Sequence, residues 1–241
     1  MNKKQYEDNN FIIYAPDTLK FIIDKMIGIL NKSFEFYKKL FDINKFRKVQ
    51  INFFDEIDDF KDYLYSLGTK KDSLPEYTTG TYDKGMINAY INPKILFGTK
   101  LYYKNLHLAS HELFHIMYKE LILQKYNINR IIWFDEGMAQ LFSLENDFIF
   151  DPEKFKIWIN NIINETKDFP NLNELNHGTS FVNEKYNGYD LSLLVVKYLY
   201  DTLSFEEFKK LMRDPDKIKK YGNKLNEIID FYKEKLDEKH L

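Results

Sequence analysis

Two histidines four residues apart, His111 and His115, constrain this chain more than any other feature of its sequence. On a helix they lie on one face, about 40° apart around the axis, so both imidazoles can bind one metal ion. Glu112 lies one position from that face, where its carboxylate can reach a metal-bound water without displacing it. Glu136 offers a third ligand from a second predicted helix. Two histidines and one glutamate with an open fourth position are typical of catalytic zinc sites.

The composition restricts the kind of metal site that the chain can build. The 241 residues include no cysteine and only five histidines, so any metal must be held by histidine and carboxylate ligands. Disulfide scaffolds and thiolate zinc sites are excluded. The 35 Lys and Arg residues and 37 Asp and Glu residues give a net charge of −2. We expect no nucleic-acid partner, because such proteins carry a basic excess.

No segment of the sequence is predicted to enter a membrane. The first ten residues are polar, and the apolar run 11–13 is too short for a signal peptide. Asp24 and Lys25 interrupt the apolar segment 21–30, as in an amphipathic helix. We expect a soluble, cytoplasmic protein with no membrane partner. A chain from which an export signal had been removed would look the same.

The apolar patterns predict a mixture of strands and helices, followed by helices alone. Strands are expected at 11–15 and 49–54 and as a hairpin at 79–82 and 86–91, and helices at about 18–41, 55–67, 103–124, 133–145, 153–166, 189–203, 204–212 and 215–237. This order predicts an α+β fold with two lobes. The N-terminal α/β lobe spans 1–125 and ends in the motif helix, and a helical lobe spans 126–241. The metal site is expected in the cleft where they meet.

Charge and geometry assign a role to each residue of the predicted site. His111 and His115 bind zinc as neutral imidazoles, and Glu136 binds it as a carboxylate. The metal polarises a substrate carbonyl and lowers the pKa of a water molecule towards ~7. Glu112 accepts the proton of that water and passes it to the leaving amine. Zinc is the expected metal, although cobalt or manganese could replace it.

Two neighbours of Glu136 have structural interpretations. Asp135 is either a hydrogen-bond partner of a ligand histidine or the N-cap of its own helix. Gly137 has no side chain, and we expect it to let the second helix lie close to the motif helix. The alternative is that Gly137 has no special role and is tolerated within the helix at a cost of ~1 kcal/mol of stability.

The tetrahedral intermediate of acyl transfer needs a hydrogen-bond donor besides the metal. The polar, glycine-containing segment 177–190 offers Tyr189 first, and then Tyr186 and His177 as substrate-binding residues. Because the chain has 18 tyrosines, packing is the alternative for each tyrosine.

The strand 85–92 is a further candidate for substrate binding. If it lies at the edge of the sheet, Asn88, Ala89 and Tyr90 can pair with an extended peptide through main-chain hydrogen bonds. An ordinary interior strand is the alternative, and edge position cannot be deduced from the sequence.

The motif His111-Glu112-x-x-His115, together with the segment 133–139 (Trp-Phe-Asp-Glu-Gly-Met-Ala), resembles the gluzincin peptidases. It is most similar to the compact bacterial peptidase MA-like domains, which are related to thermolysin and aminopeptidase N. The resemblance is strongest over about 80–145 and extends more loosely to 186–199. It implies a zincin-like fold, zinc at the two histidines and Glu136, and Glu112 as the general base.

Two departures limit what this resemblance implies. The chain lacks the Gly-x-Met-Glu-Asn segment with which aminopeptidase N relatives hold a free amine, so aminopeptidase activity is not implied. Gln140 stands where thermolysin-type enzymes have an aspartate. We expect a zinc-dependent peptidase that cuts within peptides or small proteins. The alternatives are a catalytically inactive peptidase-like module that binds peptides or proteins, and a zinc hydrolase of non-peptide bonds.

Overall fold

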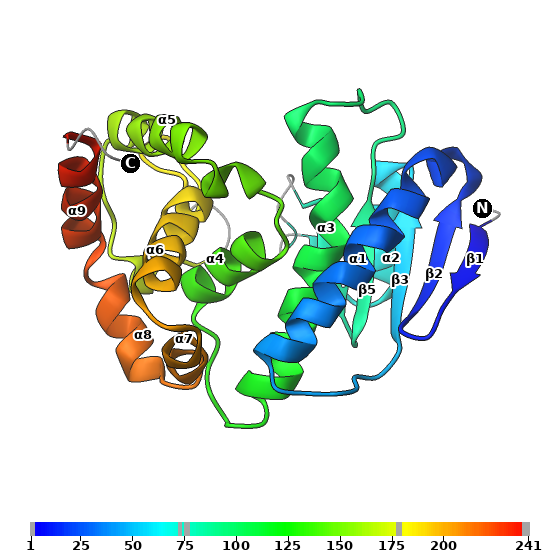
Figure 1. Ribbon diagram of the computed structural model, residues 1–241. Helices are drawn as coiled ribbons and strands as arrows, with labels where there is room; N and C mark the ends of the chain where they lie inside the picture. Colours follow the sequence, from blue (N-terminus) through cyan, green and yellow to red (C-terminus); the bar gives the residue numbers. More distant parts are fainter. Residues whose placement is uncertain (1–2, 72–73, 75–77, 177–179, 238–241) are drawn as a thin grey trace. The chain divides into compact units, whose positions relative to one another are not determined.

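The computed structural model describes residues 3–71, 74, 78–176 and 180–237 (Figure 1). The chain divides into two compact units, Met1–Met117 and Tyr118–Leu241. All named strands belong to the first unit, and the described part of the second is built from helices. The predicted α+β class is confirmed. No helix in the described ranges is both long and apolar enough to span a membrane.

The first unit is built on one mixed sheet, which has the strand order β1-β2-β3-β5-β4 in the described residues. Its strands are β1 (Lys3–Glu7), β2 (Phe11–Pro16), β3 (Val49–Phe54), β4 (Gly80–Asp83) and β5 (Met86–Tyr90). Neighbouring strands β2, β3 and β5 are parallel, whereas β1 and β4 run antiparallel at the two edges. The strands near 11–15 and 49–54 and the hairpin are confirmed. Strand β1 was not predicted.

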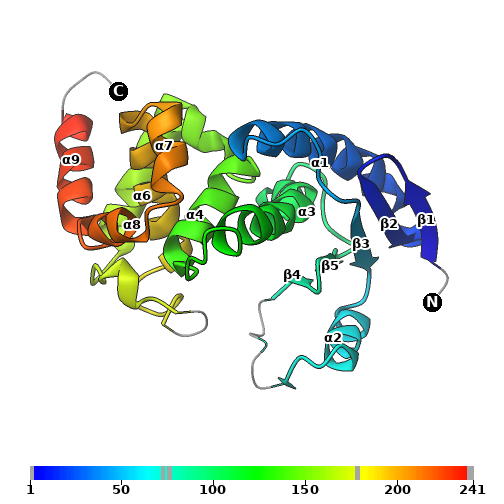
Figure 2. The same cartoon turned by 90° about the horizontal axis from the view of Figure 1, so that it is seen from below.

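Two helices, α1 (Lys20–Leu40) and α2 (Ile57–Ser66), lie on opposite faces of this sheet (Figure 2). Alternate residues of a strand point to opposite faces, so the central strand β3 supplies apolar side chains to both layers. On the α1 face, the rings of Phe11 and Phe34 meet at a centroid distance of 5.4 Å. On the α2 face, Phe54 and Phe60 meet at 5.8 Å.

The motif helix α3 (Lys100–Tyr118) is held against α1. The hydroxyl of Tyr37 donates to the carbonyl of Ser110 at 3.1 Å. The ring of Tyr37 meets that of Phe114 edge-on, with centroids 5.5 Å apart. The helix continues into the π-helical turn Lys119–Leu123, so the end of the predicted helix 103–124 is π rather than α. The motif therefore lies in a long helix, as predicted, and buried aromatic contacts hold this helix in place.

The second unit contains the helices predicted for it, with one difference. They are α4 (Ile132–Phe142), α5 (Pro152–Glu165), α6 (Gly188–Thr202), α7 (Phe205–Leu211), α8 (Pro215–Gly222) and α9 (Leu225–Asp237). Asp151, Asn187, Ser204 and Asp214 cap α5, α6, α7 and α8 with their side chains. The single helix predicted at 215–237 is instead two helices. The first of them, α8, ends just after Lys219, whose carbonyl oxygen accepts a hydrogen bond from the side-chain amide of Asn173 at 2.8 Å. This bond satisfies a carbonyl group in the last turn of α8.

Gly137 lies where α4 and α6 come closest. A Cβ atom built on Gly137 would lie 2.5 Å from the carbonyl oxygen of Ser192 and 2.7 Å from Cγ2 of Val196, both on α6. The glycine therefore permits a close approach of helices, as expected. The predicted partner is wrong, because the nearest atoms belong to α6 rather than to the motif helix.

We expect Gly137→Ala to destabilise the protein by ~1–3 kcal/mol, since the added methyl group overpacks a backbone contact. Gly28→Ala in α1 is the matched control, because nothing lies within 4 Å of a Cβ built there. Alanine has the higher helix propensity, so the control is expected to gain up to ~1 kcal/mol. Urea unfolding followed by circular dichroism measures both changes. Equal shifts for the two variants would contradict the close-contact role of Gly137.

Candidate metal centre

His111 and His115 lie one helical turn apart on α3 and point at a common place. Their Nε2 atoms are 3.0 Å apart, and their ring centroids are 4.8 Å apart. Both side chains are buried, at 8% and 3% exposure. Neutral imidazole has one donor and one acceptor nitrogen, so two ring nitrogens this close either share a proton or face one cation.

Glu112 and His115 lie alongside the edge strand β4. A Cβ atom built on Gly80 would lie 2.8 Å from Oε1 of Glu112 and 2.7 Å from Cδ1 of Leu108. Glycine at this position therefore leaves room for the Glu112 carboxylate. Two residues further along β4, the ring of Tyr82 lies beside that of His115, with centroids 5.7 Å apart and planes at 32°. The roles of Gly80 and Tyr82 could not be predicted from local patterns, because they depend on how β4 packs beside α3.

The strand predicted to bind substrate is not at the edge of the sheet. β5 pairs with β3 on one side and with β4 on the other, and Asn88 and Ala89 are fully buried. Asn88 also accepts a hydrogen bond from Asn52 at 2.8 Å. The prediction that Asn88, Ala89 and Tyr90 are open to an extended peptide is therefore wrong, since a strand paired on both sides has no free backbone edge. In the described sheet, β4 occupies that edge.

In the second unit, Glu136 and Asp135 share one cation, Arg130. Nη2 of Arg130 donates to Oε1 of Glu136 at 2.8 Å, and Nε donates to Oδ2 of Asp135. Both carboxylates are buried, at 5% and 1% exposure, whereas Arg130 is half-buried. Arg130 was not predicted as part of the site, because a single arginine in a loop ahead of an acidic pair forms no recognisable motif.

Asp135 is not the N-cap of its helix. The N-cap of α4 is Ile131, and the amide of Asp135 donates to the Ile131 carbonyl at 3.0 Å, inside the first turn. The predicted capping role is therefore wrong. Asp135 instead contributes to the electrostatics of the unit interior. Burial raises the pKa of Tyr118, and the charge of Asp135 raises it further. The Tyr118 hydroxyl donates to the carbonyl of Met212 at 3.3 Å.

Gln140 connects the helix of Glu136 to the start of α6. Its Nε2 donates to the carbonyl oxygen of Tyr189 at 3.0 Å. The amide of Tyr189 in turn donates to the side chain of Asn187 at 3.0 Å, and its ring packs edge-on against Phe181, with centroids 4.7 Å apart. Tyr189 therefore has a fixed backbone in the first turn of α6. Its predicted role as a donor to the reacting carbonyl stays a prediction.

Tyr186 and His177 were predicted from the same segment, 177–190, as substrate-binding residues. The hydroxyl of Tyr186 donates to the carbonyl of Ser180 at 3.0 Å, which fixes the local loop. His177 lies outside the described residues. Their predicted contact with substrate stays a prediction.

Comparison with known proteins assigns the chain to no family. No protein-family model matches it, and no curated protein is significantly similar to it. The likeness to gluzincins therefore rests on the motifs alone.

Proposed function

We propose that the chain is a zinc-dependent peptidase of the gluzincin type, in which His111, His115 and Glu136 hold one zinc ion. One observation carries this proposal. All three side chains are buried and each can offer one ligand atom to a metal ion, and the Nε2 atoms of His111 and His115 already lie 3.0 Å apart on one face of α3. Three such ligands leave one tetrahedral position for water or substrate, as catalytic zinc sites require.

The chemistry of the donor set fits zinc. Two ring nitrogens that each bind zinc at about 2.0–2.1 Å in tetrahedral geometry are separated by roughly 3.3 Å. The Nε2 atoms of His111 and His115 are 3.0 Å apart, so a small adjustment accommodates the ion. When bound, zinc polarises a carbonyl group and acidifies a water molecule.

The local charge also favours a divalent cation. Asp135 and Glu136 are two buried carboxylates, and Arg130 forms an ion pair with each of them. Buried charges are costly unless they are paired or coordinate a metal. A carboxylate has two oxygens, so the contact of one Glu136 oxygen with Arg130 is compatible with metal binding by the other.

Glu112 is the residue that we assign to proton transfer. Its carboxylate is 7% exposed and lies in the space that Gly80 leaves open beside β4. From this position it accepts a proton from the attacking water and returns it to the leaving amine. The edge of β4, which passes the same carboxylate, is the element that we assign to holding the extended backbone of a peptide substrate.

The zincin-like architecture is part of this proposal. Three observations support it: a mixed sheet with an antiparallel edge strand, a helix that carries the two histidines, and a later helix that carries the glutamate. Cleavage within peptides is proposed because the chain lacks the segment that holds a free amine in aminopeptidase N relatives.

We expect the purified protein to contain one zinc ion per chain and Glu136→Ala to bind zinc more than about 100-fold more weakly, since loss of even an outer-shell partner costs 10–100-fold. Asp135 remains as the partner of Arg130 in this variant, so the fold is expected to persist. Elemental analysis and competition with a chelator measure the affinity. Glu153→Ala, an exposed change on α5, is the control.

A peptide-library digest with and without chelator completes the test. Chelator-sensitive products are expected from the parent protein and from Glu153→Ala, but not from Glu136→Ala. Peptide binding without products in the presence of stoichiometric zinc would identify an inactive binding module instead. If Glu136→Ala bound zinc as tightly as the parent protein, Glu136 would not be a metal ligand.

A further inference from the structure

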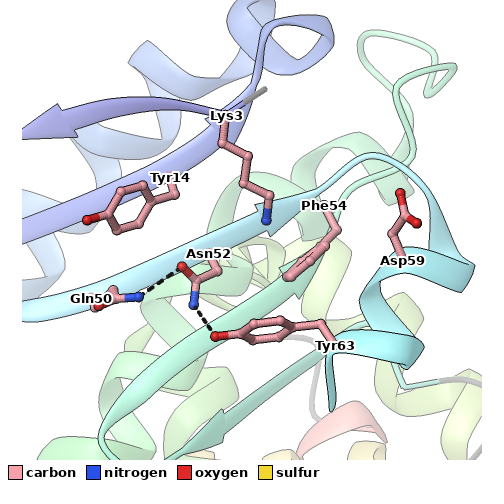
Figure 3. Close-up of a pocket in the computed structure, with 7 residues that line it drawn as sticks. All are labelled: Lys3, Tyr14, Gln50, Asn52, Phe54, Asp59 and Tyr63. Carbon is pink, nitrogen blue, oxygen red and sulfur yellow. Dashed lines mark hydrogen bonds between the residues drawn. The ribbon is translucent and has the colours of Figure 1, made fainter. Parts of the chain in front are cut away.

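A pocket of about 700 Å³ lies on the α2 face of the sheet, in the first unit (Figure 3). We call it the sheet pocket. Side chains from β1, β2, β3 and α2 line it, namely Lys3, Tyr14, Gln50, Asn52, Phe54, Asp59 and Tyr63. None of the motif residues lines this pocket, so it requires an explanation of its own.

Lys3 places an amine inside the sheet pocket. Its Nζ atom lies 3.3 Å from the centroid of the Phe54 ring, and the side chain is half-buried. Across the described residues, Lys3 forms no ion pair or side-chain hydrogen bond. Its neighbour Lys4 lies on the other face of β1, is exposed, and forms an ion pair with Asp17 at 2.6 Å. Two adjacent lysines therefore have opposite environments.

A fixed network of amides forms the polar wall of the sheet pocket. Gln50 donates to Oδ1 of Asn52 at 3.1 Å, and Asn52 donates to Asn88 at 2.8 Å and to the hydroxyl of Tyr63 at 3.5 Å. Asn52 is only 6% exposed. These amides are held by one another, and the rings of Tyr14, Phe54 and Tyr63 supply the apolar wall (Figure 3).

We propose that Lys3 is a covalent attachment site for a small aldehyde with an apolar body, which the sheet pocket holds. The neutral amine attacks the carbonyl carbon to form a carbinolamine. The carbonyl oxygen then leaves as water with both protons of the amine, and a carbon–nitrogen double bond forms. No oxidant or reductant is needed. The Phe54 ring, which lies against the amine, packs against the imine once it has formed.

The electrostatics of the sheet pocket supply the neutral amine that this reaction needs. Burial lowers the pKa of Lys3 to about 8, although the charges of Asp55 and Asp59 act in the opposite direction. Tyr14 and Tyr63 also line the pocket, from β2 and α2. A lysine of pKa 8 has a roughly 300-fold larger neutral fraction at pH 7 than one of pKa 10.5. The ion pair of Lys4 instead raises the pKa of its amine.

The test is reductive labelling of the full chain with benzaldehyde and cyanoborohydride over pH 6–11, followed by peptide mapping that separates Lys3, Lys4 and the N-terminal amine. We expect Lys3 to be labelled at least 30-fold faster than Lys4 at pH 7, after allowance for its lower intrinsic nucleophilicity. The rate at Lys3 is expected to rise through a midpoint near pH 8. It should also saturate with benzaldehyde concentration, because the aldehyde binds before it reacts.

Two variants control the assignment. Lys3→Arg keeps a positive charge and is expected to lose the fast, saturable labelling, whereas Lys4→Arg is expected to keep it. Labelling of Lys3 at the rate of Lys4, or with a midpoint above pH 10, would overturn the proposal. A rate that stays linear in benzaldehyde concentration would overturn it as well, since it would show that the pocket does not hold the aldehyde.

Discussion

Glu112→Gln is expected to lower kcat for peptide hydrolysis by about 10²–10⁴-fold while zinc binding is retained. The amide has nearly the shape of the carboxylate but cannot accept a proton from the attacking water. Because Glu112 is not among the three proposed ligands, its neutralisation leaves the donor set of His111, His115 and Glu136 intact. Initial rates on a fluorogenic peptide taken from the library digest, with parallel elemental analysis, measure the two effects.

Glu35→Gln is the matched control for this prediction. Glu35 is an exposed residue of α1 that pairs with Lys38 three positions away, so its change should leave kcat within about two-fold. Parent-like turnover in Glu112→Gln would rule out Glu112 as the base. Loss of zinc together with turnover would show instead that Glu112 holds the site together.

Local sequence patterns predicted most of the elements, because each of these elements buries a periodic apolar face. The strand Val49–Phe54 was predicted from its alternation of apolar and polar residues. The hairpin was predicted from its turn, where Lys84 and Gly85 adopt the positive φ values that such turns need. Strand β1 escaped prediction for the opposite reason. It is an edge strand of mostly charged and polar residues, a composition that protects a sheet edge from aggregation. The same composition leaves no alternation of apolar and polar residues from which the strand could be predicted.

Strand order, in contrast, could not be predicted from local patterns. β4 and β5 form a hairpin whose two strands have similar local sequence requirements. Which of them lies at the edge depends on the pairing of β5 with β3, more than thirty residues away in the chain. The close contact of Gly137 with Ser192 of α6 could not be predicted either, because it joins residues that are far apart in the chain. The motif residues were found because their chemistry fixes their spacing within one helix, whereas their neighbours are set by long-range packing.

Arg130→Met is expected to destabilise the helical unit by ~3–5 kcal/mol in the absence of metal, because it removes the ion-pair partner that two buried carboxylates share. Arg130 is the common partner of Asp135 and Glu136, which are 1% and 5% exposed. Arg130→Lys should be intermediate, since an ammonium group cannot reproduce a two-sided guanidinium contact. Urea unfolding measures the loss, and Arg47→Met, which removes an exposed arginine bonded to the Gly85 carbonyl, is the control.

Zinc makes this prediction a test of the metal centre as well as of the ion pair. Arg130 and a dication would compensate the same charge on Glu136, so each should reduce the benefit of the other. Saturating zinc stabilises both proteins by mass action. We expect it to stabilise Arg130→Met more, which narrows the gap in the free energy of unfolding between the parent and the variant. A parent-like unfolding midpoint without metal would show that the ion pairs do not stabilise the unit. A gap that is unchanged by zinc would show that the metal does not act on Glu136, even if it binds elsewhere.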